Sequence, residues 1–458
     1  MKNTPNSVSR SSARFAGWPI AHTRPSMPRS IPARALFIAV LTMTMVSPML
    51  GQALPAAEAA PVSTGFALPR TAGTLNYGVS ASESLLWGYQ GSQGAYSATN
   101  LTGNLGYISS SRLYPFSMVF SGGHSWSTSG EPSYSYLNLA MSQVANLKKW
   151  NFIVSDNVSY LPGTSIGSLS GVPGVGDLGI PPVQVGEETS QGVLTAYSDR
   201  VNNTVSGSVQ RQVTGKTSIN GFGSYAIMRF LGSGSQGLDG DSTTGGGGIS
   251  HQLNPRTSFG GSYLYSSYTY PDNSSGITEP GFTSQTASMQ FSHQFSRKLS
   301  MTVSAGPQWS GIDSGGTQAL SAYAAASLAY VGQFSHASLS YVRSTNAGFG
   351  AVGGALSQGG GLSVGRTFAR VWNCAATANY TESSSVPSAS VTFDAFDTTV
   401  AGAQVSRAIM RSLSAYASYT FEHQSSPSST AVDVFTGREQ VVGFGVTYSP
   451  SSIHVGRQ

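Results

Sequence analysis

Residues 287–310 read ASMQFSHQFSRKLSMTVSAGPQWS, two runs of alternating apolar and polar side chains joined by a short basic turn. From Leu299 onward, one face carries Leu, Met, Val, Ala, Pro and Trp, while the other carries only Ser, Thr, Gly and Gln. Side chains of a β-strand alternate between its two faces, so each run predicts a strand with one apolar and one small polar face. The stretch therefore predicts a β-hairpin.

The same kind of turn recurs along the chain, roughly every 36–42 residues with one gap of about 66, which indicates a repeated hairpin unit. The eight turns are Ser110-Ser111-Arg112, Leu147-Lys148-Lys149, Gly215-Lys216, Asn254-Pro255-Arg256, Ser296-Arg297-Lys298, Val331-Gly332-Gln333, Arg366 to Arg370 and Arg407 to Arg411. Eight turns join sixteen strands. A first strand near 75–87 and a last near 439–449 raise the expected number to about 18, with 16 as the alternative.

Two apolar faces contain a carboxylate. Asp156 interrupts the apolar face of 150–160, and Glu83 interrupts that of 75–87. A β-bulge in 75–87, or a shifted strand, would move Glu83 to the polar face.

The composition favours a membrane barrel over other folds. Only 9% of residues are charged and 39% are hydrophobic, with 55 Gly, 21 Tyr and 20 Phe. A soluble sandwich, propeller or fibre also alternates, but it would place Lys and Glu on its polar face. We therefore expect an all-β, antiparallel up-and-down barrel in the bacterial outer membrane, with short basic periplasmic turns and long Gly/Ser-rich extracellular loops.

The first 53 residues have the pattern of a signal peptide. Six basic residues without a carboxylate precede the apolar run Ala35–Leu50, and small residues offer cleavage after residue 53 or 59. A start at Met27 would give a leader of ordinary length. A membrane anchor is the alternative, but 16 apolar residues are short for a span.

Three segments are expected after the leader: a short periplasmic segment 54–73, the barrel 74–449 and a C-terminal tail 450–458. Without the leader, 18 basic residues face 19 acidic ones, a net charge of −1, so the calculated pI of 9.2 reflects the leader. The charge gives no reason to expect nucleic-acid binding. The lone Cys374 excludes a disulfide framework, and we expect no metal and no cofactor.

Charge sorts by side of the predicted barrel. The basic residues of the tight turns are Arg112, Lys148, Lys149, Lys216, Arg256, Arg297, Lys298, Arg366, Arg370, Arg407 and Arg411. The acidic residues expected in the opposite loops are Glu131, Asp177, Glu187, Glu188, Asp239, Asp241, Asp272, Glu279, Asp313, Glu382, Asp394, Asp397 and Asp433. A basic periplasmic mouth would concentrate anions, or the basic residues only satisfy turn carbonyls and mark register; both interpretations stay open.

Inside the barrel, the charged residues expected to face the lumen are Arg229, Arg343 and Glu422. The longest loop, about 161–195, would either fold into the lumen as a constriction or stay outside as a cap.

No catalytic motif is predicted. His336-Ala337-Ser338 has the His-x-Ser spacing of outer-membrane lipases, but it lies at the tight-turn end of its strand, so we expect no enzyme. His251 and His293 occupy equivalent places in two parallel hairpin segments, which indicates a turn-associated position rather than metal ligation.

The last third of the chain carries a family resemblance. Phe396-Asp397-Thr398-Thr399-Val400-Ala401-Gly402-Ala403-Gln404-Val405-Ser406-Arg407 leads through a basic turn into 413–424, LSAYASYTFEHQ, and the barrel closes with 441–449, VVGFGVTYS. This wording resembles porin-like outer-membrane barrels encoded in exopolysaccharide biosynthesis loci. The resemblance implies passage of polysaccharide through the outer membrane and no catalytic residues.

Three hypotheses follow for function: a pore that passes or exports polysaccharide or other solutes, a general small-solute porin, and a structural or adhesive surface barrel with a blocked lumen. The expected partners are outer-membrane lipid and lipopolysaccharide, the barrel assembly machinery and polysaccharide.

Overall fold

The computed structural model describes residues 72–88, 95–127, 133–161, 199–231, 239–271, 281–312, 318–346, 354–386, 395–425 and 436–456, all within one compact unit, Met49–Gln458. These residues form a single antiparallel sheet of 19 strands. The expected leader and the 161–195 loop lie outside the described residues, apart from Leu161. None of the described segments is a helix long and apolar enough to cross a membrane.

The strands follow one another as predicted, each pairing with its neighbours in sequence. The first nine are β1 (Gly73–Trp87), β2 (Ala95–Ser109), β3 (Phe116–Ser127), β4 (Tyr134–Asn146), β5 (Trp150–Leu161), β6 (Asp199–Gln212), β7 (Thr217–Leu231), β8 (Gly240–Asn254) and β9 (Thr257–Thr269). The others are β10 (Phe282–Gln294), β11 (Leu299–Ile312), β12 (Ala319–Val331), β13 (Ser335–Asn346), β14 (Ala355–Phe368), β15 (Trp372–Ser385), β16 (Phe396–Ala408), β17 (Leu413–Ser425), β18 (Gly437–Tyr448) and β19 (Ile453–Val455).

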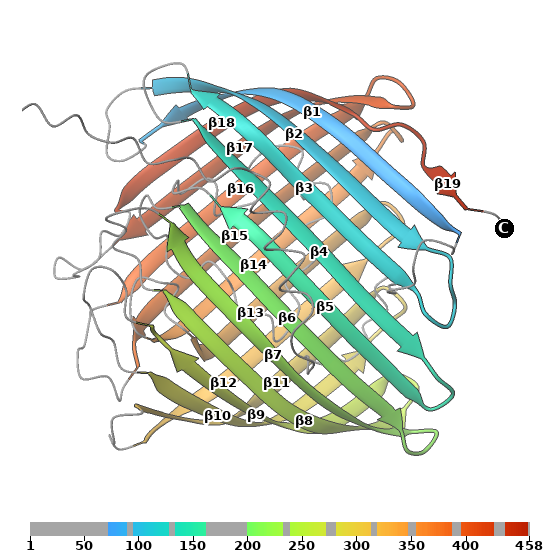
Figure 1. The fold of residues 1–458 in the computed structure, drawn as a ribbon, viewed down its shortest axis with the longest axis vertical. Helices are drawn as coiled ribbons and strands as arrows, with labels where there is room; N and C mark the ends of the chain where they lie inside the picture. Colours follow the sequence, from blue (N-terminus) through green and yellow to red (C-terminus); the bar gives the residue numbers. More distant parts are fainter. Residues whose placement is uncertain are drawn as a thin grey trace, which may run out of the picture. The chain divides into compact units, whose positions relative to one another are not determined.

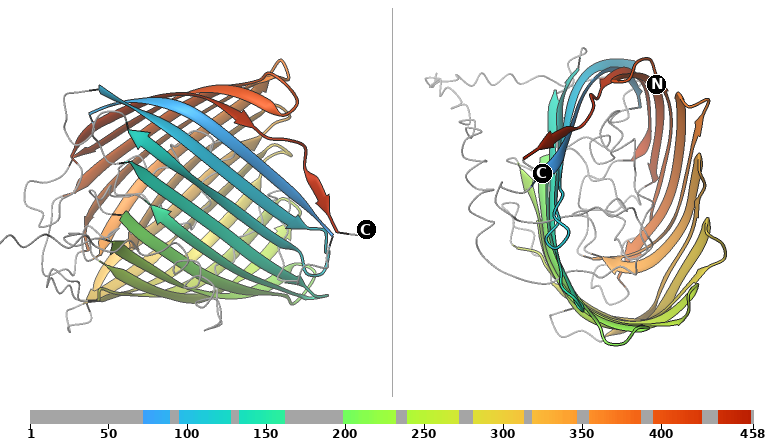
Figure 2. Two further views of the ribbon diagram at one scale, coloured as in Figure 1. Left: turned by 45° about the horizontal axis from the view of Figure 1, so that its top comes forward. Right: turned by 90° about the vertical axis from the view of Figure 1, so that its right-hand side faces the viewer.

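The sheet closes on itself. β1 pairs with β18 from Val79 opposite Tyr448 to Trp87 opposite Gln440, so eighteen strands form an up-and-down barrel. Blue β1 lies beside red β18 in Figures 1 and 2. The short β19 adds to the other end of β1, with Gly73 opposite Val455. The predicted fold class and strand number are confirmed.

All eight tight turns fall where the basic segments predicted them, at one end of the barrel. The pairs Leu147/Trp150 and Ser296/Leu299 each exchange two backbone hydrogen bonds, which leaves Lys148-Lys149 and Arg297-Lys298 as the central residues of two-residue turns. The longer connections all lie at the other end. We call these ends the short-turn end and the long-loop end.

Each strand has one lipid-compatible face and one small polar face. In β10, Met289 and Phe291 are exposed while Ser284 and Thr286 are buried; in β11, Val303 is exposed while Ser304 is buried. Most large exposed apolar residues of the other strands also lie on the outward-facing positions; Ile108, Val119 and Ile153 are exceptions on the inner face. In a barrel the exposed apolar face points outward and the polar face points into the lumen.

The two carboxylates that interrupt apolar faces remain on the outer face. β1 pairs with β2 continuously from Gly73 to Trp87, so no bulge moves Glu83 inward. Instead Thr99 donates its hydroxyl to Glu83 at 2.7 Å, and Asn203 donates its amide to Asp156 at 2.7 Å. Cross-strand hydrogen bonds therefore accommodate these carboxylates where they stand.

Met289→Arg tests the assignment of faces. Met289 is 68% exposed near the middle of β10, so a charge there would face hydrocarbon. We expect the substitution to lower the free energy of unfolding by about 2–4 kcal/mol, measured by urea titration in lipid vesicles. The neighbouring inner-face change Gln290→Arg is the control and should cost clearly less. Equal losses for both variants would contradict the assignment.

Candidate functional site: the lumen wall and its two ends

Hydroxyl and amide groups cover the inner wall and pair across neighbouring strands. These pairs are spread over several strands rather than clustered in one place: Ser155 with Ser206 (2.6 Å), Ser218 with Ser250 (2.8 Å), Thr244 with Ser266 (3.1 Å), Ser262 with Ser288 (2.9 Å) and Ser357 with Ser383 (2.8 Å). Gln308 donates to both Ser284 and Thr286 at 3.1 Å. Such groups present both donors and acceptors but no fixed charge.

Charge on the inner face is sparse. Within the described strands, the alternation of side chains places only three charged residues on this face, Arg200, Glu422 and Glu439, and all three are buried. Each lies within three residues of a long-loop end. The rest of the described inner wall is uncharged, so it offers little basis for separating cations from anions.

Of the three residues expected in the lumen, the structure places Glu422 on the inner face and both arginines on the outer face. Arg229 shares its face of β7 with exposed Tyr225 and Leu231, and Arg343 shares its face of β13 with exposed Leu339 and Tyr341. Both arginines lie an even number of residues from these apolar side chains. Because side chains two apart share a face of a strand, the sequence already contained a signal for their outward placement.

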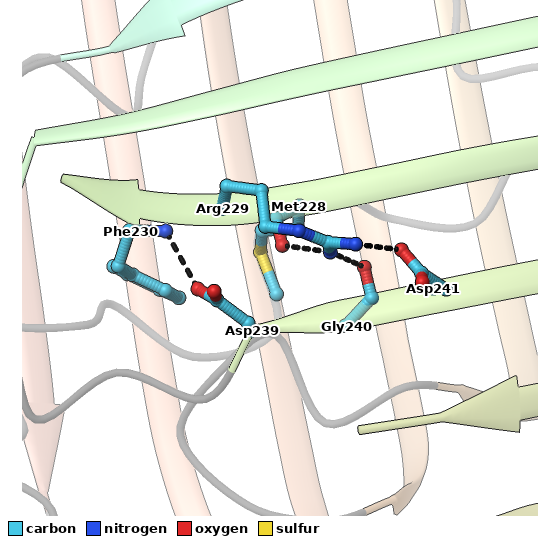
Figure 3. Close-up of polar contacts among 6 residues, drawn as sticks. All are labelled: Met228, Arg229, Phe230, Asp239, Gly240 and Asp241. Atoms are coloured by element: carbon cyan, nitrogen blue, oxygen red, sulfur yellow. Dashed lines mark hydrogen bonds and ion pairs between the residues drawn. The ribbon is translucent and has the colours of Figure 1, made fainter. Parts of the chain in front are cut away.

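The outward arginines have partners on their own face. The Arg229 guanidinium lies 2.6 Å from a carboxylate oxygen of Asp241 and donates to the carbonyls of Met228 and Gly240 at 2.9 and 3.0 Å (Figure 3). Arg343 donates to Gln358 at 2.8 Å, and Gln358 donates to Glu382 at 2.7 Å. These contacts hold both guanidinium groups on the outer surface near the long-loop end.

Three acidic residues expected in loops lie in strands instead. Asp241, Glu382 and Asp397 belong to β8, β15 and β16, near their long-loop ends. Tyr380 donates to Asp397 at 2.8 Å. The strands extend further than alternation of apolar residues predicts, because near the rim the outer face turns polar where it leaves the hydrocarbon. Asp239 precedes β8, and the other predicted loop acids lie outside the described residues.

All eleven basic residues of the predicted periplasmic mouth are exposed at the short-turn end. Those within strands point outward. Arg366 shares the outer face of β14 with Leu362 and Val364, and the Arg407 guanidinium lies 5.3 Å from the ring centroid of Trp372. The short-turn end is therefore basic on its rim and outer face.

Aromatic packing closes part of the lumen at the long-loop end. Tyr268 and Phe282 stack with ring centroids 4.5 Å apart, and they form a buried cluster with Tyr270 and Val386. Val386 follows β15, five strands from β10, which is roughly 24 Å along the wall. The cluster therefore brings together segments of the wall that are five strands apart.

A glycine makes this closure tight. Gly354, just before β14, has a φ of +94°, and a Cβ built on it would lie 2.6 Å from the Phe282 ring. A larger residue would be strained by its backbone conformation and would collide with the ring.

A second buried cluster lies at the seam between β1 and β18. Leu86, Ala98 and Val441 form a buried cluster, and Glu422 stands directly opposite Glu439 in the pairing of β17 with β18. Neither carboxyl oxygen of Glu422 has a hydrogen-bond partner in the part of the chain that the structure describes. These two carboxyl groups are therefore buried side by side near the long-loop end, in the strand pair next to the seam.

The lumen is open toward the short-turn end. Ile108, Val119 and Ile153 lie on the inner face near that end and are 38%, 49% and 37% exposed. Inner residues near the long-loop end, such as Ser310 and Ser383, are buried. Small inner residues beside the short turns, such as Ser117 and Thr447, are buried as well, so the difference between the two ends concerns the large apolar side chains.

These features define the class of protein. A closed barrel leaves no unpaired strand edge, its outer face is apolar, its inner face is polar, and its strand number is even. Only helices and closed barrels can cross a bilayer, since every backbone polar group must be bonded within the protein. The chain is a transmembrane β-barrel of the bacterial outer membrane.

Comparison with known proteins adds likeness of architecture. No protein-family model matches the chain, and no curated protein matches its sequence. Among solved structures, OpdQ of Pseudomonas aeruginosa is similar over 82% of this chain and 98% of its own, with 10% identity and a TM-score of 0.39. OccAB3 of Acinetobacter baumannii is similar over 82% and 99%, with 10% identity and a TM-score of 0.41. The resemblance to barrels of exopolysaccharide loci stays a prediction.

Arg229→Gln tests the outward placement of that arginine. Because the guanidinium faces away from the lumen, we expect the reversal potential in a salt gradient to stay unchanged, with at most about 1 kcal/mol lost from stability. Asn220→Lys is the matched control: Asn220 is on the inner face of the same strand, so its variant should shift the reversal potential toward anions. A shift caused by Arg229→Gln would place that side chain in the ion path.

Phe282→Ala tests the closure at the long-loop end. Loss of the ring removes the stack with Tyr268 and loosens the buried cluster that includes Val386, so we expect a larger single-channel conductance than in the unchanged protein. Phe291→Ala, on the outer face of the same strand, should leave conductance unaltered. Unchanged conductance in Phe282→Ala would show that the cluster does not limit the lumen.

Proposed function

We propose that this barrel is an outer-membrane channel for small, uncharged, hydrophilic solutes. The observation that carries the proposal is the inner wall of the described strands, where hydroxyl and amide groups pair with one another and charge is confined to three buried residues near one end. A wall of this kind exchanges hydrogen bonds with a hydrated solute and places no electrostatic barrier in its way.

Hydroxylated solutes fit this wall best. Sugar hydroxyls both donate and accept hydrogen bonds, as do the Ser and Thr hydroxyls that line the described strands. The resemblance to barrels of exopolysaccharide loci makes saccharides the first solutes to test, including longer glycan chains. The apolar inner residues Ile108, Val119 and Ile153 add a surface for the less polar faces of such a ring.

A second candidate function is supported by the closures at the long-loop end. The cluster around Phe282 and the seam cluster around Leu86 bury inner residues there. A barrel closed in this way would be a gated channel, or a surface protein whose lumen does not conduct. The Phe282→Ala variant separates these: a gated channel opens further, whereas a non-conducting barrel stays silent.

The decisive experiment is permeation through the folded protein in vesicles and planar bilayers. We expect neutral mono- and oligosaccharides to enter vesicles faster than charged solutes of equal size. We also expect a cation-to-anion permeability ratio close to one, because the inner wall carries little charge. Strong ion selectivity would contradict the proposal, and absence of any permeation, even with Phe282→Ala, would favour the blocked surface barrel.

A further inference from the structure

We propose that the basic short-turn rim binds the phosphate head groups of anionic phospholipids in the periplasmic leaflet. This interaction surface is independent of the proposed channel function, since it lies on the outside of the barrel. It consists of the eleven exposed basic residues of the turns together with the outward Arg211, and of apolar and aromatic side chains beside them.

Charge is fully segregated at this rim. Nine acidic residues are described, and none of them lies in a short turn. Eight lie in the long-loop half of a strand or beyond its long-loop end, and the ninth, Asp156, lies near the middle of β5. A cationic rim without neighbouring carboxylates attracts an anionic lipid surface, and each basic side chain near that surface adds to the attraction.

The turns hold the charges at head-group height. Lys148-Lys149 and Arg297-Lys298 are central residues of two-residue turns, so they form the tips of their hairpins and cannot reach far beyond the bilayer surface. Arg370 lies in the short turn between β14 and β15. Its φ of 59° is a left-handed conformation that costs a non-glycine residue stability, yet an arginine occupies it.

Apolar side chains accompany the charges. Leu113 lies beside Arg112, Leu147 beside Lys148, and Met410 beside Arg411, and all three apolar side chains are exposed. A binding site for soluble anions has no need of exposed apolar side chains at its edge. A lipid surface accepts both, since the apolar group enters the acyl boundary while the basic group meets the phosphates.

The basic strand residues at this end point toward lipid and not toward the lumen. Arg211 lies over the ring of Trp150 with 5.0 Å to its centroid, and Arg407 over Trp372 with 5.3 Å. Trp150 belongs to the exposed outer face of β5. Tryptophan prefers the membrane interface, so each pair holds a guanidinium at the level of the head groups. This outward direction favours lipid binding over an anion funnel into the lumen.

The two rim tryptophans allow a direct test. Variants are made in which Trp150 or Trp372 is the only tryptophan of the barrel, the others being changed to Phe, and each is folded into vesicles. Fluorescence quenching is then compared between brominated phosphatidylglycerol and brominated phosphatidylcholine at equal mole fraction. We expect about a fivefold preference for the anionic lipid at both reporters, weakened by salt.

The combined change Lys148→Gln, Lys149→Gln and Arg211→Gln should abolish the preference at Trp150 and keep it at Trp372, which serves as the internal control. Arg229→Gln with Arg438→Gln, on the outer face near the long-loop end, should change neither reporter. Equal quenching by the two lipids would overturn the proposal. It would also be overturned if the triple variant kept its lipid preference and instead shifted the reversal potential, the result expected of an anion funnel.

Discussion

Closure of the sheet is the constraint on which every other feature depends. A strand in hydrocarbon cannot leave its backbone N–H and C=O groups unbonded, because each would cost several kcal/mol. Pairing of β1 with β18 removes both edges at once, with nine consecutive residue pairs from Val79/Tyr448 to Trp87/Gln440. Once the ring is closed, every strand must present one face to lipid and one to the lumen. Residues that alternate along the sequence then point to the outside and to the inside of the barrel in turn.

The inner wall shows how such a barrel keeps a polar surface without charge. Ser and Thr side chains are short, so they satisfy one another across adjacent strands and leave the lumen uncovered by long side chains. Buried polar groups must be paired, and the short hydroxyl ladders meet that requirement locally. A lumen of this type suits solutes that carry hydroxyls, whereas an ion-selective pore needs rings of charge that the described wall lacks.

The two ends of the barrel are built for different surroundings. At the long-loop end the outer face carries hydrogen-bonded carboxylates and arginines, such as Arg229 with Asp241, and aromatic packing closes part of the lumen. At the short-turn end the lumen is open, and the rim is basic and apolar. The facing carboxyl groups of Glu422 and Glu439 lie at the closed end, beside the seam that closes the sheet. The aromatic cluster and the inward-facing carboxyl groups thus lie at the long-loop end, and the basic rim lies at the short-turn end.

The sequence by itself determined the fold class, the eighteen strands and the positions of the tight turns. These depend on local signals, namely a period of two in side-chain polarity and short basic turns, which act over a few residues. His251 and His293 illustrate how far this reaches: predicted to be equivalent turn positions, each lies 2.9 Å from a threonine hydroxyl on the neighbouring strand, Thr217 and Thr257.

Only the tertiary structure decided which partners hold the charged residues and which distant segments pack together at the long-loop end. The spacing of Arg229 and Arg343 from apolar residues was a local signal for the outer face, but their partners Asp241 and Gln358 come from adjacent strands. The buried cluster that includes Phe282 and Val386 joins segments five strands apart. No local pattern encodes such a contact, because it depends on the curvature of the closed sheet and on which strands come to face each other across the lumen.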